Sequence, residues 1–174
     1  MISHASFSGR RLGTERANHA WRTRDLRDAG AIVALGSDWP IAPFDPRSII
    51  ASAQTRRPPG RPDVAPVQPQ QALTARAALE GYTSQYWKSV GEPGGLIEPG
   101  ARADLSVFRR NPLRDAPDDF ATTQVVLTVV DGDVVVLNDT DEPRPAPPVS
   151  IPARNEGRCN VMLALRRRTN RVNI

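Results

Sequence analysis

The 174-residue sequence has few of the residues that build disulfides and metal sites. It has one cysteine, Cys159, so no disulfide can form within the chain and no cysteine cluster can hold a metal. It has two histidines, His4 and His19, which do not form a His-x-His pair. Lys88 is the only lysine. These shortages exclude a disulfide framework and a cysteine-based zinc site.

Long apolar runs are missing as well. No run approaches the roughly 18 apolar residues of a membrane span, and the first twenty residues have no apolar core of signal-peptide length. We therefore expect a cytoplasmic protein with no membrane partner. A length of 174 residues allows one domain or one and a half. A complete α/β barrel needs more, typically about 250 residues.

Positive charge is concentrated near the C-terminal end. Residues 1–138 carry 16 Lys and Arg against 15 Asp and Glu, whereas residues 139–174 carry 7 against 4. A nucleic-acid-binding domain normally shows a basic stripe on its folded surface. The nearly neutral first part therefore predicts no specific nucleic-acid partner.

One short apolar run ends at a carboxylate. Residues 31–35, between two glycines, are typical of a strand buried on both faces of a parallel sheet. Asp38 follows at the end of this run, where α/β barrels carry their catalytic groups. The alternative is that Asp38 is an ordinary turn residue whose carboxylate caps its own backbone. Asp38 is therefore the candidate catalytic residue, with a turn role left open.

The segment around Asp38 also supplies the candidates for a substrate pocket, which are Ser37, Trp39 and Phe44. Three prolines within residues 40–46 exclude a regular helix or a central strand, so we expect a stiff loop over the strand end. The two aromatic side chains could line a pocket on this loop. They could equally do no more than cover the end of the strand.

Helical patterns lie on both sides of this loop. We expect helices over residues 15–29, 47–55 and 70–90. Thr74 is a good N-cap for the last of them, and Gly30 is placed to end the first in the left-handed conformation. A helix, a glycine and then a buried strand form the second half of a βαβ unit, which predicts an α/β fold.

The pattern changes to antiparallel β-structure at about residue 93. Residues 103–108 alternate as a strand does, and two β-rich runs follow on either side of Asp131-Gly132. An Asp-Gly pair between β-branched runs is a strong hairpin signal.

Three regions are therefore expected. They are an α/β part over residues 1–92, β-strands over 93–138 and a disordered tail over 139–174.

Taken in order, these motifs resemble the carboxyl-terminal end of metal-dependent amidohydrolases, in particular the amidohydrolase family 3 group. The resemblance rests on Gly-Ser-Asp-Trp-Pro at residues 36–40, on the Leu-Thr and Tyr-Thr pairs of the helix over 70–90, and on Gly-Leu-Ile-Glu-Pro-Gly-Ala-Arg-Ala-Asp-Leu at residues 95–105. It covers roughly residues 11–138. It implies the C-terminal part of a TIM-like (β/α)8 barrel, followed by strands of a small β-sandwich.

In that family the strand ending in Gly-Ser-Asp is the eighth barrel strand. Its aspartate binds a catalytic zinc, or orients and deprotonates the metal-activated water, and the resemblance gives this role to Asp38. It also implies that Glu98-Pro99-Gly100 and Asp104 are structural turn residues. The implied reaction is hydrolysis of a carbon–nitrogen bond in a small amide-type substrate.

The sequence departs from the family in its metal ligands. The family site begins with a His-x-His pair and adds further histidines, whereas the sequence has no such pair and only two histidines, His4 and His19. A catalytic zinc normally needs three protein ligands, so Asp38 alone cannot hold it. We therefore expect this chain to correspond to the C-terminal third of such an enzyme and to be inactive alone. The alternative is a non-catalytic interaction module or a subunit that completes a split amidohydrolase, with a partner chain or a dimer.

Overall fold

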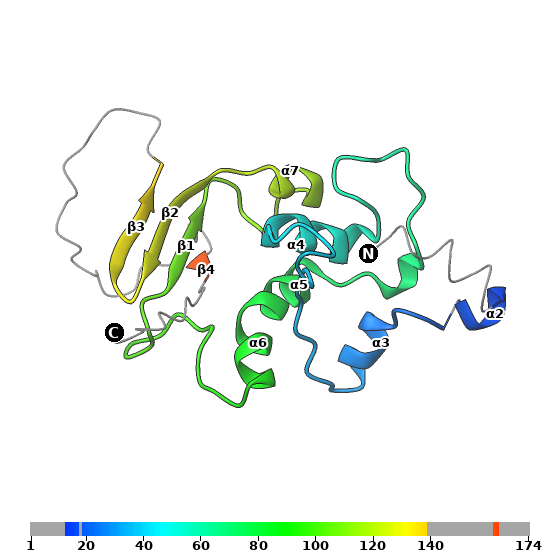
Figure 1. Ribbon diagram of the computed structural model, residues 1–174, viewed down its shortest axis with the longest axis horizontal. Coiled ribbons are helices and arrows are strands. Elements are labelled where there is room, and N and C mark those ends of the chain that lie inside the picture. Colours follow the sequence, from blue (N-terminus) through cyan, green and yellow to red (C-terminus); the bar gives the residue numbers. More distant parts are fainter. Residues whose placement is uncertain (1–12, 18, 139–161, 164–174) are drawn as a thin grey trace.

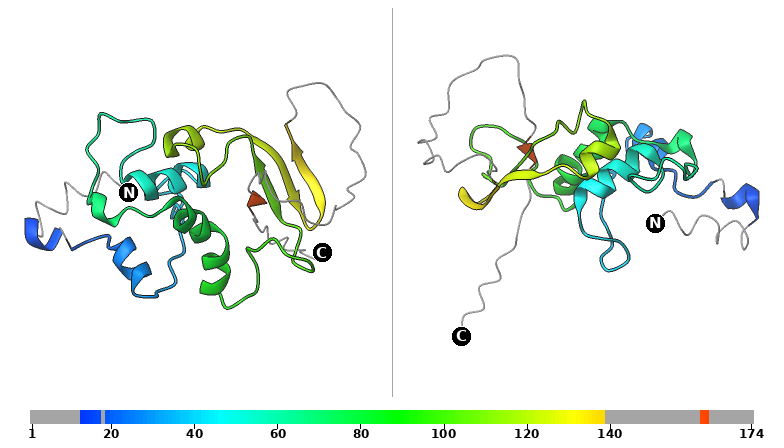
Figure 2. Two further views of the ribbon diagram at one scale, coloured as in Figure 1. Left: turned by 180° about the vertical axis from the view of Figure 1, so that it is seen from behind. Right: turned by 90° about the horizontal axis from the view of Figure 1, so that it is seen from above.

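The structure is a computed structural model of the chain, and it describes residues 13–17, 19–138 and 162–163. It combines helices with one small antiparallel sheet (Figure 1). The sheet lies at one end of the molecule, the helices within residues 46–121 occupy the middle, and the two short helices α2 (Thr14–Ala17) and α3 (Thr23–Asp28) lie at the other end. Views from behind and from above show α2 standing apart from the central helices (Figure 2).

The first predicted helix is present as two short ones. Helix α2 spans Thr14–Ala17 and α3 spans Thr23–Asp28. The backbone of Trp21 between them has φ 57°, a left-handed conformation that no α-helix contains. Gly30 ends α3 as predicted, with φ 87°. Its N–H donates to the Arg27 carbonyl and the next N–H donates to the Leu26 carbonyl, the bonding pattern of a Schellman motif.

The strand predicted over residues 31–35 is wrong: these residues form no strand. Expected to be buried on both faces, they are exposed or half-buried instead, and the Ile32 side chain is 53% exposed. A parallel strand is held by hydrogen bonds to strands on either side, and the described residues place none beside this run. Residues 31–35 contact the helices instead, since the Leu35 N–H donates to the Gly81 carbonyl oxygen at 2.9 Å.

Helix α4, Pro46–Thr55, follows the loop and confirms the second predicted helix. The Asp45 carboxylate caps it by accepting the Arg47 N–H, and Pro46 occupies the first turn, where a missing N–H costs nothing. Arg56, with φ 58°, ends the helix. A long loop then leads to the short 3-10 helix η2, Pro69–Gln71.

The third predicted helix has the predicted cap but is not continuous. Thr74 accepts the Ala77 N–H at 3.2 Å and begins α5, Ala75–Tyr82. Helix α6, Ser84–Ser89, follows after a break at Thr83, where φ is −119° and ψ is −103°.

The sheet contains the predicted hairpin. Strands β2, Val125–Val130, and β3, Asp133–Leu137, pair antiparallel, and a bulge shifts their register next to Thr128. The turn between them uses Asp131 at φ 52° and Gly132 at φ 89°, both in the left-handed region that a type I′ turn requires.

The remaining strands complete a sheet of order β3-β2-β1-β4. Strand β1, Leu105–Phe108, pairs with β2, and β4, Met162–Leu163, pairs with the opposite edge of β1. Strand β4 falls within residues 139–174, which were expected to be disordered. The other residues of that tail lie outside the described residues.

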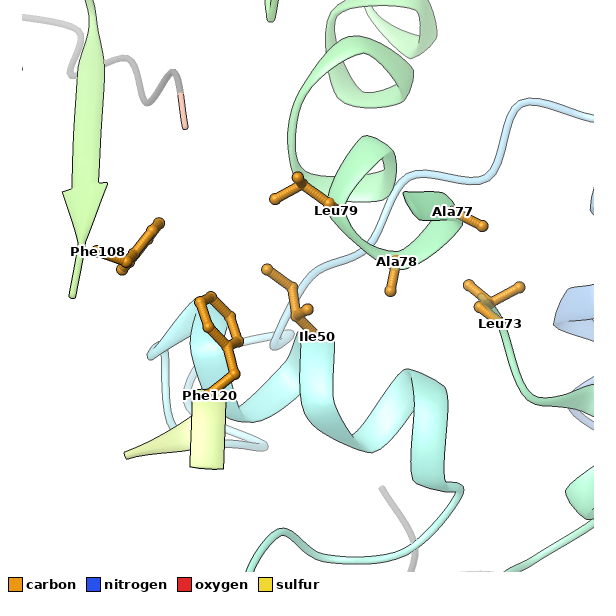
Figure 3. Close-up of a cluster of buried hydrophobic side chains, with 7 residues drawn as sticks. All are labelled: Ile50, Leu73, Ala77, Ala78, Leu79, Phe108 and Phe120. Carbon is orange, nitrogen blue, oxygen red and sulfur yellow. The ribbon is translucent and has the colours of Figure 1, made fainter. Parts of the chain in front are cut away.

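One hydrophobic cluster joins the helices to the sheet (Figure 3). Helix α7, Pro117–Ala121, brings Phe120 against α4, and the Phe120 ring meets the ring of Phe108 from β1 edge-on at 5.2 Å between centroids. The buried members of the cluster are Ile50, Leu73, Ala77, Ala78, Leu79, Phe108 and Phe120. This core takes side chains from both sides of residue 93. No helix among the described residues is long and apolar enough to cross a membrane.

Candidate functional site

Asp38 begins a tight turn on the surface. Its backbone has φ 52°, a left-handed conformation that aspartate tolerates better than most residues. Its carbonyl oxygen accepts the Ile41 N–H at 2.8 Å. The side chain is exposed, and within the described residues no hydrogen bond or ion pair involves the carboxylate. Asp38 therefore lies in a turn, as one alternative predicted, but its carboxylate makes no capping bond to the described backbone and remains available for chemistry.

Two of the three pocket candidates are brought together beside Asp38. The rings of Trp39 and Phe44 meet edge-on, with centroids 5.8 Å apart and an interplanar angle of 84°. They are 66% and 75% exposed. Ser37, the third candidate, is half-buried just before Asp38. The two rings form an exposed patch rather than an enclosed pocket.

The loop that carries these residues is fixed at its far end by Asp45. The Asp45 carboxylate accepts the Arg47 backbone N–H at 3.0 Å and pairs with the Arg47 guanidinium at 2.7 Å. The same guanidinium donates to the Thr123 carbonyl oxygen, and its hydrogen bonds to the Asp45 carboxylate raise the pKa of Arg47. This anchor was not among the residues predicted from the sequence, although aspartate followed by proline is a common start of a helix.

Tyr82 is a second polar group that the sequence did not reveal, because its position on α5 predicts only an apolar contact. The ring packs against the hydrophobic cluster, and the hydroxyl is buried without a hydrogen-bond partner in the described structure. Burial, with a smaller contribution from the Asp45 carboxylate, raises the pKa of Tyr82 to about 12. The phenol is therefore neutral at physiological pH.

The described residues do not fit a complete metal site. They contain no group of three or more His, Cys, Asp and Glu side chains that could hold a metal ion. His19 is exposed on the turn after α2, and His4 lies outside the described residues. Asp38 is one carboxylate, whereas a catalytic zinc needs about three protein ligands.

A cavity of about 470 Å³ lies away from Asp38. It is bounded by Trp87 of α6 and by the segments around Gly94 and Pro99. None of the candidate site residues lines it. The candidate site is therefore defined by Asp38 and its loop and not by this cavity.

Comparison with known proteins decides the family. The model of the amidohydrolase family matches residues 2–136, which is most of the chain. The chain belongs to the amidohydrolase family. The predicted resemblance is thereby confirmed, and members of this family are metal-dependent.

Three curated relatives match this amidohydrolase chain, each over only part of its own length. N-substituted formamide deformylase from Arthrobacter pascens is 37% identical over 111 residues, which are 63% of this chain and 20% of that protein. Putative amidohydrolase YtcJ from Bacillus subtilis is 29% identical over 72% of this chain and 24% of its own length. Protein LONG AFTER FAR-RED 3 from Arabidopsis thaliana is 29% identical over 76% of this chain and 23% of its own length. The chain thus spans about a fifth to a quarter of these relatives, and no solved structure gives a significant match.

Proposed function

We propose that this chain supplies the Asp38 segment of a hydrolase that cleaves carbon–nitrogen bonds in small amide-type substrates. Asp38 carries the proposal, since it ends the Gly-Ser-Asp motif and its exposed carboxylate has no partner in the described structure. Membership of the amidohydrolase family supports the reaction class. The name of its relative N-substituted formamide deformylase suggests N-substituted formamides as the substrates to test first.

In this proposal Asp38 works as a general base and then as a general acid. Its carboxylate takes a proton from the attacking water and returns it to the leaving amine, a role that typically contributes about 10² to 10⁴-fold to the rate. The turn closed by the Ile41 N–H and the bond from Leu35 to Gly81 hold the backbone on either side of Asp38. The metal that the family uses requires ligands beyond those described here.

We further propose that residues 31–35 become the last strand of a TIM-like barrel when the rest of that barrel is beside them. The exposed Ile32 and the half-buried Val33 are apolar surface that such neighbours would bury. The isolated chain is then an incomplete site and is inactive. Residues 105–137 would contribute their strands to the accompanying β-sandwich.

The experiment has two parts. First, the purified 174-residue chain is assayed for bound zinc and for hydrolysis of N-substituted formamides, and we expect neither stoichiometric metal nor turnover. Second, the chain is co-expressed with the part of the Arthrobacter deformylase that lies outside the matched segment. Recovery of activity supports the proposal, and zinc with turnover in the isolated chain contradicts its incompleteness.

Two variants test the role of Asp38 in the co-expressed assembly. Asp38→Asn removes the proton acceptor, so activity should fall by about 10² to 10⁴-fold. Asp63→Asn is the matched control, because Asp63 is an exposed carboxylate that pairs with Arg61 on a different loop. Full activity in Asp38→Asn would remove Asp38 from the mechanism.

A second candidate function is a non-catalytic subunit or interaction module. The exposed apolar side chains of β3 favour it, in particular Val134 and Leu137 at about 60% exposure. Contiguous exposed apolar surface commonly marks a protein interface. An assembly that forms with the complementary segment but stays inactive would support this candidate over the enzyme.

A further inference from the structure

The aromatic pair Trp39 and Phe44 is the most exposed apolar feature close to Asp38. Phe44 has the largest exposed fraction, 75%, of any large apolar side chain in the described part of the chain. The two rings contact each other directly, because they meet edge-on at an interplanar angle of 84°. Trp39 follows Asp38 directly and lies in the turn that the Ile41 N–H closes, so the pair is on the loop that carries the carboxylate.

The backbone beneath the pair is held at both ends. At the start, Leu35 bonds to Gly81 of α5 and the Ile41 N–H closes the turn at Asp38. At the end, the Asp45 carboxylate caps α4. The prolines between these anchors restrict the loop further. Rings on a fixed support lose little freedom when a ligand binds, which favours binding.

The chemistry of the loop favours a neutral aromatic group. Residues 39–44, Trp-Pro-Ile-Ala-Pro-Phe, contain no charged side chain and no hydrogen-bonding side chain other than the indole N–H. Aromatic rings attract one another in edge-to-face or offset arrangements beyond the effect of buried area. A third aromatic ring can pack against an edge-to-face pair with this additional attraction. A small alkyl group contributes only the apolar area that it buries.

We infer that the Trp39–Phe44 pair binds an aromatic substituent on the nitrogen of the amide substrate and so places the carbon–nitrogen bond at Asp38. This inference rests on the proposed function for the position of the reacting bond. It goes further in naming the substrate class, which is N-aryl amides in preference to N-alkyl amides of similar polarity.

Binding to the full chain tests the inference without requiring activity. Formanilide and N-methylformamide are titrated separately while the indole N–H signal of Trp39 is followed by NMR, with the signal assigned through Trp39→Phe. We expect formanilide to shift this signal at concentrations at least five-fold lower than N-methylformamide. Equal responses to the two probes would overturn the inference.

A matched pair of variants tests whether binding depends on the Trp39–Phe44 pair or on any exposed aromatic ring. Phe44→Ala should weaken the formanilide response at least three-fold. Tyr86→Ala is the control, since Tyr86 also lies exposed in an edge-to-face pair, 5.6 Å from the Trp87 ring, but on α6. A formanilide response that Phe44→Ala leaves unchanged contradicts the inference.

Hydrolysis by the co-expressed assembly distinguishes the failure of this inference from the failure of the proposed function. The expected result is a kcat/KM ratio that favours formanilide and that falls at least three-fold in Phe44→Ala but not in Tyr86→Ala. Hydrolysis with no aryl preference overturns the inference and leaves the proposed function standing. Aryl-selective binding in an assembly that never hydrolyses amides supports the binding site and contradicts the enzyme.

Discussion

Gly95 lies directly against the backbone of Thr83. A Cβ atom at Gly95 would lie 2.4 Å from the Thr83 carbonyl carbon and 2.6 Å from its oxygen. This contact brings the segment that leads to the sheet against the break between α5 and α6. No side chain fits at this point, because the neighbouring atoms belong to the backbone and cannot move aside alone.

Gly95→Ala should therefore destabilise the protein by more than the cost of placing alanine in a left-handed backbone conformation. Gly91→Ala is the matched control, because Gly91 has the same φ of 70° but nothing within 4 Å of its added Cβ. The control should lose about 1 kcal/mol for the left-handed conformation, and Gly95→Ala about 2 kcal/mol more for the clash. Urea unfolding of both variants measures the difference, and equal losses would show that the close approach is unimportant.

The close contact at Gly95 also explains where sequence-based prediction failed. The cap at Thr74, the end of α3 at Gly30 and the hairpin at Asp131-Gly132 are local, since a few neighbouring residues decide them. The break at Thr83 coincides with the close approach of Gly95, twelve residues further along the chain. A pattern of apolar residues does not contain that contact, so it predicted one continuous helix over residues 70–90.

The candidate site divides in the same way. The motif placed Asp38 at the end of an apolar run, and that position is a property of sequence order. The strand over residues 31–35 depended on neighbouring strands and did not form without them. The edge-on contact of Trp39 and Phe44 and the bond from Arg47 to the Thr123 carbonyl oxygen depend on how the chain folds back, which spacing alone does not determine.

Asp104 is expected to stabilise the hairpin. It is 2% exposed, and its Oδ1 accepts the Asp131 N–H at 2.7 Å, which holds the turn between β2 and β3 against the start of β1. Asp104→Ala leaves that N–H without its acceptor and should cost about 1–3 kcal/mol. Asp133→Ala, on exposed β3, should change stability by about 0.5 kcal/mol or less. Chemical unfolding compares them, and equal effects would show that the bond is unimportant.

The Arg57–Asp118 pair should make stability depend on acidic pH. Hydrogen bonds from the Arg57 guanidinium, with a further one from the Gly60 N–H, lower the pKa of Asp118 below its usual 3.8. The folded state thus binds this proton less readily than the unfolded state, so the contribution is complete above pH 3.8 and is lost as the pH falls through the lowered pKa. Asp118→Asn should lower Tm by about 1–3 °C at pH 6.

The difference in Tm between the wild type and Asp118→Asn should then shrink as the pH falls below 3.8. Asp28→Asn serves as the control, because its pair with Arg24 is 45–59% exposed and should contribute little. Thermal melts from pH 6 to pH 2.5 give the comparison. A difference that stays constant over this range would contradict a protonation effect at Asp118.

Tyr82→Phe should be neutral or stabilising at pH 7 and more strongly stabilising at high pH. The buried Tyr82 hydroxyl has no hydrogen-bond partner in the described structure, so removing it relieves a desolvation penalty of up to about 1 kcal/mol.

The pKa of Tyr82 is about 12 in the folded state against an ordinary value of 10.0, so the unfolded state releases its proton first as the pH rises. Wild-type stability therefore falls between pH 10 and pH 12, by at most about 1.4 kcal/mol per pH unit. Phenylalanine has no such proton, so the advantage of Tyr82→Phe in urea unfolding should grow over this range, whereas the matched variant Tyr86→Phe, at an exposed ring, should follow the wild type.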